Sequence, residues 1–229
     1  FPMSRQLTLS LQPSPRCTFS SFVPGRNEEL VERCRGLPEG FSITCIHGEP
    51  GSGRSHLLQA TCHHHAGLDR RVAYLPLAVA PADAEMLSGL ERYGVVALDD
   101  LESWLGFVPL ERGLIGLYQA LQQRNAALLF TSDRSPSELE CAFDDLSSRL
   151  RGGQAFALEE LEDHDKARVL RQRAAECGML IDAAVMSYWM RRARRGFTGL
   201  LADLDRLDEA SLSEQRRVTV PLVKQVLGL

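Results

Sequence analysis

The sequence lacks a long apolar run, a recognisable signal peptide and a strong excess of charge of one sign. No stretch approaches the roughly 20 apolar residues that a membrane-spanning helix needs, so we expect no membrane attachment. The 26 Lys and Arg against 30 Asp and Glu give a formal net charge of -4. This balance argues against a dedicated nucleic-acid coat protein and against a membrane-surface protein.

Metal-binding patterns are also scarce. The six cysteines are scattered and none belongs to a CxxC pair, so no zinc site is predicted, and free buried cysteines indicate a reducing, cytoplasmic location. His63, His64 and His65 are consecutive. Consecutive residues of a helix point to different sides of it, so these three cannot chelate one ion together.

A glycine-rich loop is the feature around which the 229 residues are organised. The loop Gly48-Glu49-Pro50-Gly51-Ser52-Gly53-Arg54-Ser55 lies between a β-prone run, 43–47, and a helix-period run from His56. Strand, loop and helix in this order predict a phosphate-binding loop, in which Ser55 would hold Mg²⁺. Arg54 stands where a lysine is expected. An arginine still neutralises phosphate, but as a broad fork, so we expect a loop that holds a nucleotide and cleaves it poorly.

Acidic and polar residues follow two further apolar runs. Val95–Leu98 leads into Asp99 and Asp100. We expect Asp99 to hold Mg²⁺ through water and Asp100 to stand for a water-polarising Glu, one methylene too short. Residues 127–131 lead into Ser132-Asp133-Arg134. Asp133 is either a sensor of the γ-phosphate or part of a turn that opens a helix after Pro136.

The remaining pattern predicts an α/β domain with a parallel sheet covered on both faces, followed by a small all-α lid. We expect domains at 1–18 (a flexible tail), 19–160 (nucleotide-binding) and 161–229 (the lid). The predicted strands are 43–47, 72–75, 95–100, 127–131 and 154–158, and the predicted helices of the nucleotide domain are 28–35, 82–93 and 111–124. The predicted lid helices are 164–177, 182–195 and 198–215, with a short helix from Pro221.

Two further segments, one with alternating apolar residues and one rich in arginine, each allow two interpretations. Gln6-Leu7-Thr8-Leu9-Ser10-Leu11 places apolar residues at every second position, which suits a short edge strand or a linear docking peptide. The cluster Arg191, Arg192, Arg194 and Arg195 suits a solvated helix end or a contact with phosphates or DNA.

Together these motifs resemble an AAA+ ATPase module, and more closely the nucleotide-binding region of the replication initiator DnaA. The matching stretches are Thr18–Gly25, the phosphate loop, Thr131–Arg134 and Ser148-Arg149-Leu150. The chain stops at Leu229, without the initiator's DNA-binding domain. The chain is similar to the Hda family, the short DnaA homologues that inactivate DnaA. The similarity lies in Gly-Arg-Ser-His-Leu at 53–57, in the tail peptide and in the ending from Leu204 through Lys224.

The resemblance implies a negative regulator of chromosomal replication initiation. The tail, through Gln6, Leu7, Leu9 and Leu11, would dock on the DNA polymerase III sliding clamp (its beta subunit). Arg149 would act in trans as an arginine finger on DnaA-bound ATP, which leaves inactive DnaA-ADP. The family also implies a bound ADP, or another nucleotide with Mg²⁺, and nucleotide contacts from Phe22, Val23 and His56 beside the loop. DNA would be reached mainly through the clamp, which places this cytoplasmic protein at the nucleoid, and a homo-oligomer is compatible.

One departure from the family pattern concerns the lid. AAA+ modules usually place a lid arginine on the phosphates, and our alignment puts Thr198 there, with Arg194 or Arg195 as substitutes. The alternative to the regulator is an autonomous AAA+ ATPase of the clamp-loader or helicase-loader type. Arg54, Asp100 and Thr198 all argue for weak self-catalysis and so favour the regulator.

Overall fold

The computed structural model describes residues 13–193, 196–214 and 217–229, and the chain divides into two compact units. The larger unit consists mainly of residues 27–158 and the smaller one mainly of Glu159–Leu229. Each is described by itself.

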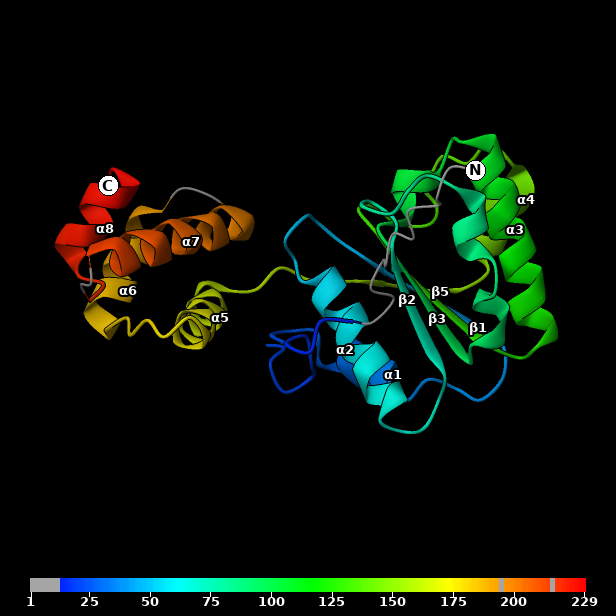
Figure 1. Cartoon of the computed structure of the whole chain (residues 1–229), viewed down its shortest axis with the longest axis horizontal. Helices are drawn as coiled ribbons and strands as arrows, with labels where there is room; N and C mark the ends of the chain where they lie inside the picture. Colours follow the sequence, from blue (N-terminus) through cyan, green and yellow to red (C-terminus); the bar gives the residue numbers. More distant parts are fainter. Residues whose placement is uncertain (1–12, 194–195, 215–216) are drawn as a thin grey trace, which may run out of the picture. The chain divides into compact units, whose positions relative to one another are not determined.

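A five-stranded parallel sheet forms the centre of the larger unit (Figure 1). The strand order is β2-β3-β4-β1-β5, and the strands are β1 (Ser42–His47), β2 (Val72–Pro76), β3 (Val95–Asp99), β4 (Ala127–Ser132) and β5 (Gln154–Ala157). All five predicted strands are confirmed to within a residue or so. The polar tip of β4 lies between the strand before the phosphate loop and the acidic strand, as the sequence suggested.

Helices cover both faces of this sheet (Figure 1). On one face lie α1 (Glu28–Arg35) and α2 (Arg54–Ala66), and on the other lie α3 (Val108–Gln123) and α4 (Asp144–Arg151). Central strands that are buried on both faces are mostly apolar, and every residue of β3 and β4 is buried, including the polar residues at their carboxyl ends. The predicted parallel α/β architecture is therefore confirmed.

The predicted helix at 82–93 is wrong. Two short 3-10 helices take its place, η1 (Ala84–Leu87) and η2 (Leu90–Arg92). Between them Ser88 is extended and Gly89 has a φ of 85°, a left-handed conformation that ends a helical run and that glycine adopts at little cost. A third 3-10 helix, η3 (Leu101–Trp104), follows β3.

The predicted helix after Pro136 is also absent from the structure. The segment forms a single turn, in which the Glu138 carboxylate accepts hydrogen bonds from the backbone N–H and the hydroxyl of Ser135, at 3.0 and 2.7 Å. The next helix is α4, which begins only at Asp144.

The smaller unit is entirely helical in its described residues. It contains α5 (Asp163–Glu176), α6 (Ala183–Arg192), α7 (Phe197–Glu214) and α8 (Val220–Leu227). Trp189 and Leu207 are fully buried at its centre, where Leu170 and Val223 pack beside them. This unit has its own hydrophobic core, as the predicted lid requires.

A buried carboxylate joins three segments of the larger unit. Glu111 of α3 is fully buried and accepts backbone hydrogen bonds from Gly106, Ala142 and Phe143, at 2.7 to 3.0 Å. Phe143 is the residue that precedes the first turn of α4. Glu111 therefore fixes the start of α4 against α3.

Replacing Glu111 by Ala should lower the free energy of unfolding by about 3 kcal/mol, because three backbone N–H donors lose their buried, charged acceptor. Urea titration followed by circular dichroism measures this change. Glu140→Ala, which removes an exposed carboxylate from the nearby loop, is the control and should change stability little. Equal stability of the two variants would contradict the role given to Glu111.

Candidate functional site

The predicted phosphate loop connects β1 to α2. Gly51 and Gly53 have φ angles of 84° and 104°, a left-handed region in which a side chain would be strained. A Cβ at Gly53 would also lie 3.3 Å from a ring carbon of Phe22. Gly53 immediately precedes α2, so the unpaired N–H groups of the first helical turn follow the loop directly. This is the local geometry that binds an anion.

Arg54 is the first residue of α2, and its side chain is turned to the acidic end of β3 rather than to solvent. It is 8% exposed. Its Nη2 lies 3.2 Å from Asp100 Oδ1, and its Nη1 lies 3.9 Å from Glu102 Oε1. The cation of the loop is thus already paired with two carboxylates.

Asp99 is buried at the end of β3, and both its carboxylate oxygens accept hydrogen bonds. Tyr74 of β2 donates to one at 2.7 Å, and Thr131 of β4 donates to the other at 2.5 Å. The Thr131 hydroxyl in turn accepts the backbone N–H of Asp100 at 2.8 Å. These bonds from both neighbouring strands fix the orientation of Asp99.

Glu102 is a site residue that the sequence reasoning missed. It lies in η3, and besides facing Arg54 its Oε1 accepts the backbone N–H of Asp133 at 3.1 Å. One carboxylate therefore joins the phosphate loop to the tip of β4. The signal in the sequence was the third acid in Asp99-Asp100-Leu101-Glu102, which the search for a two-residue acidic motif passed over.

Burial controls the ionisation of these acids. It raises the pKa of Asp100, with a further contribution from the negative charge of Asp99, and Arg54 partly opposes the increase. Burial also raises the pKa of Glu102, again opposed by Arg54. Removing Arg54 would therefore make both carboxyls harder to ionise, so the three side chains form one electrostatic unit.

Asp133, the predicted phosphate sensor, is held by its own neighbour. Arg134 donates to both of its carboxylate oxygens, at 2.9 and 2.8 Å. This hydrogen bonding lowers the pKa of Asp133. Ser132, one residue earlier, is fully buried and its hydroxyl donates to the carbonyl of Arg134.

The predicted nucleotide contacts before α1 and in α2 lie close to one another. Nε2 of His56 is 3.1 Å from the Ser21 hydroxyl and 3.3 Å from the Thr18 carbonyl. The His56 ring also meets Phe22 edge-on, with centroids 5.5 Å apart. Val23 follows Phe22 in the chain, and Ser55 precedes His56 in the first turn of α2.

Arg149 lies on α4 and has two local partners. Its Nε donates to Asp145 one turn earlier, at 2.9 Å, and its guanidinium lies 4.7 Å from the centroid of the Tyr118 ring on α3. The side chain is 23% exposed. The cation is thus oriented by neighbouring side chains and still accessible.

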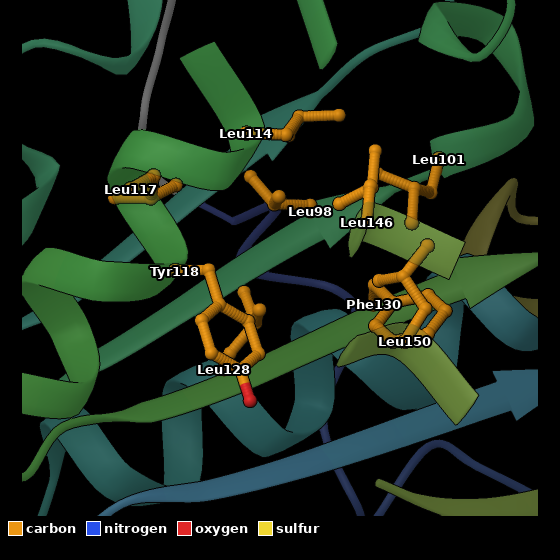
Figure 2. Close-up of a pocket in the computed structure, with 9 residues that line it drawn as sticks. All are labelled: Leu98, Leu101, Leu114, Leu117, Tyr118, Leu128, Phe130, Leu146 and Leu150. Atoms are coloured by element: carbon orange, nitrogen blue, oxygen red, sulfur yellow. The ribbon is translucent and has the colours of Figure 1, made fainter. Parts of the chain in front are cut away.

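The helices below Arg149 are tightly packed. Figure 2 shows leucines of α3 and α4 meeting Leu98 and Phe130 of the sheet, with Tyr118 at one side. The space that they enclose is only about 10 Å³, close to the room that a single water needs. Arg149 therefore projects from a rigid base.

Some predicted residues lie outside the described part of the chain. These are the docking-peptide residues Gln6, Leu7, Leu9 and Leu11, and the lid arginines Arg194 and Arg195. Thr198, at the lid position in question, is in the first turn of α7. Arg191 and Arg192 end α6, and Arg192 stacks on Tyr188 at 4.9 Å.

The described ranges contain neither a cluster of metal-binding side chains nor a helix that could span a membrane. There, no three His, Cys, Asp or Glu side chains are grouped so that they could hold a metal ion. The three consecutive histidines have different further partners: His63 contacts the Ser14 carbonyl, His64 contacts the Phe19 ring and His65 contacts the Cys34 carbonyl, while the rings of His64 and His65 meet edge-on. None of the helices among these residues is long and apolar enough to cross a membrane.

Replacing Arg134 by Ala should raise the pKa of Asp133 toward its ordinary value of 3.8, because the carboxylate loses two charged hydrogen bonds. A carboxyl-carbon NMR titration of Asp133 measures this directly. Arg92→Ala, which removes an exposed arginine beside Glu91, should leave the Asp133 titration unchanged. An unaltered titration in Arg134→Ala would show that the pair is not formed in solution.

One family model matches part of the smaller unit, and several solved structures match most of the chain. Residues 163–227 match the family model described as "Hda, lid domain". The chain is also similar in structure to domain III of the Thermotoga maritima replication initiation protein DnaA, with a TM-score of 0.80 and 18% identity over 94% of this chain and 97% of that one.

Two other solved structures have a related fold. AMPPCP-bound DnaA from Aquifex aeolicus has a TM-score of 0.67 at 20% identity, over 87% of this chain and 66% of that one. The Thermotoga maritima RuvB Holliday junction branch migration motor has a TM-score of 0.69 at 15% identity, over 92% and 71%. The chain thus has the fold of a DnaA domain III, and the match of residues 163–227 to an Hda lid domain agrees with the resemblance to the Hda family.

Proposed function

We propose that this chain is a nucleotide-bound AAA+ regulator that promotes hydrolysis of ATP on DnaA and so prevents re-initiation of replication. The observation that carries the proposal is the combination of an Hda lid domain with a DnaA-like fold that presents Arg149. In this proposal the chemistry takes place on DnaA. The chain supplies the arginine, and the sliding clamp brings it to DNA.

The residues of the phosphate loop suit a bound nucleotide. The N–H groups after Gly53 would donate hydrogen bonds to the phosphates, and Phe22, Val23 and His56 lie on the segments that would border the nucleotide. Mg²⁺ would supply charge neutralisation beside the phosphates. The Ser55 hydroxyl would contact it, and Asp99, whose oxygens already accept two hydrogen bonds, would act through a water.

Weak catalysis by the chain itself fits the surroundings of Arg54 and Asp100. A base must be free to accept a proton, and the Asp100 carboxylate is paired with Arg54. The cation that would stabilise charge on the phosphates is engaged by the same pair. We therefore propose that the loop holds ADP as a structural ligand.

Arg149 would act on the nucleotide of a neighbouring DnaA subunit. A guanidinium stabilises negative charge that develops on the transferring phosphoryl group, and such a finger can raise the rate about 10³–10⁵-fold. Asp145 and Tyr118 reduce the number of orientations of the side chain, so less entropy is lost when it meets the phosphate.

Replacing Arg149 by Ala should return DnaA-ATP hydrolysis to its unstimulated rate, a loss of about 10³-fold or more if the finger is typical. ADP formation is followed on DnaA-ATP mixed with DNA-loaded clamp and the chain. Arg151→Ala removes an exposed arginine from the same helix and should keep full stimulation. Arg149→Lys should recover only part of the rate, because lysine lacks the planar fork. Full stimulation by Arg149→Ala would exclude the finger role.

Replacing Gln6 and Leu7 together by Ala should abolish retention on clamp-loaded DNA, because a short peptide of this kind contributes roughly −8 kcal/mol through a few side chains. Surface plasmon resonance on loaded clamp measures retention, and ADP binding by the same variant should be unchanged. Ser4→Ala, outside the alternating leucines, is the control. Clamp retention by the double variant would contradict the docking-peptide interpretation.

A further inference from the structure

The cation of the phosphate loop faces two acids, and the AAA+ interpretation leaves one of them, Glu102, without a role. Arg54 is nine-tenths buried, and its guanidinium faces Asp100 at 3.2 Å and Glu102 at 3.9 Å. In phosphate loops the basic residue at this position reaches the β- and γ-phosphates. Here the same charge is directed to the acids that follow β3.

The cluster also has unused hydrogen-bonding capacity. Nη1 of Arg54 and Oε2 of Glu102 are both buried, and neither has a hydrogen-bond partner within the described residues. A buried polar atom without a partner is costly. The contact between Arg54 and Glu102 is therefore an ion pair at 3.9 Å rather than a hydrogen bond, and charge attraction holds the two groups together.

Glu102 is held in place independently of Arg54. Its Oε1 accepts the Asp133 backbone N–H at 3.1 Å from the tip of β4. The carboxylate therefore cannot follow the guanidinium without giving up that bond. If Arg54 moves to a terminal phosphate, it must leave Glu102 and Asp100 as buried acids without their counter-ion.

We propose that Glu102 and Asp100 determine which nucleotide the loop prefers, by retaining Arg54 on the acidic strand and so disfavouring a triphosphate relative to a diphosphate. A γ-phosphate would bring further negative charge near two carboxylates and would find the nearest cation engaged. A diphosphate brings no γ-phosphate to this region, and it would bind on the backbone N–H groups at the start of α2. This inference rests on the proposed nucleotide-binding function and names the residues that set its specificity.

The test measures the Kd of the full chain for ADP and for AMPPCP, a triphosphate analogue that resists hydrolysis, by calorimetry with Mg²⁺. Glu102→Gln removes one of the two carboxylates that pair with Arg54, and with it one negative charge. It should improve triphosphate binding about tenfold relative to ADP. The matched control is Glu140→Gln. Glu140 lines the same surface pocket as Glu102, so the variant makes the same change of charge nearby while leaving the Arg54 cluster intact, and its Kd ratio should equal that of the unmodified chain.

A second variant keeps the test decisive if Glu102→Gln does not fold. Arg54→Lys retains the charge, but a single ammonium cannot pair with two separate carboxylates through a fork, so discrimination against the triphosphate should also fall. Unchanged Kd ratios in the variants that fold would overturn the proposal. Equal affinity of the unmodified chain for ADP and AMPPCP would also overturn it, while leaving the nucleotide site itself in place. Binding of neither ligand would instead refute the proposed nucleotide function.

Discussion

Parallel pairing of β1, β3 and β4 is the constraint on which the candidate site depends. His47 at the end of β1 is in register with Ser132 at the end of β4, and Leu98 before Asp99 is in register with Phe130. Parallel strands end at the same edge of a sheet, so the phosphate loop, the acids and the polar strand tip must meet there. Residues that are far apart in sequence thus become hydrogen-bonding neighbours, as Thr131 and Asp99 show.

The charge at this edge is arranged around one arginine. The carboxylates of Asp99, Asp100 and Glu102, at the end of β3 and the beginning of η3, would repel one another if no cation lay beside them. Arg54 supplies that cation from the first turn of α2 and opposes the rise in the pKa of Asp100 and Glu102. A lysine there would neutralise one acid at a time, whereas the guanidinium faces two. The substitution that looked like a loss of catalytic power therefore has a structural function of its own.

Much of this site could be predicted from local patterns. The glycine spacing predicted the loop, and apolar runs that end in acids predicted β3 and the edge at which it would bind a ligand. The acidic pattern included Glu102, but neither its partners nor the role of Tyr74 could be read from the sequence, because these depend on side-chain directions set by the fold. They also could not show that Arg54 points to Asp100, since an arginine at this position can reach either a phosphate or a carboxylate.

The wrong helix predictions have a related cause. Residues 82–93 have helix-compatible composition over most of their length, and Ser88-Gly89 alone divides them. The turn at Ser135 is closed by Glu138, whose side chain takes the hydrogen bonds that a first helical turn would otherwise leave to water. Such hydrogen bonds between side chain and backbone compete with helix formation. The periodicity of apolar residues in the sequence gives no sign of them.

Helix α3 connects the fold to the proposed activity of Arg149. Near its beginning Glu111 binds the backbone where α4 starts, and two turns later Tyr118 lies beside the Arg149 guanidinium. An arginine that must meet a phosphate on another protein benefits from a fixed direction, because a flexible side chain would lose that freedom on binding. The tight packing under α4 serves the same end (Figure 2). The two halves of the proposal thus place opposite demands on arginine: Arg54 is buried and held by acids of its own chain, whereas Arg149 is oriented at the surface, where another molecule's phosphate can reach it.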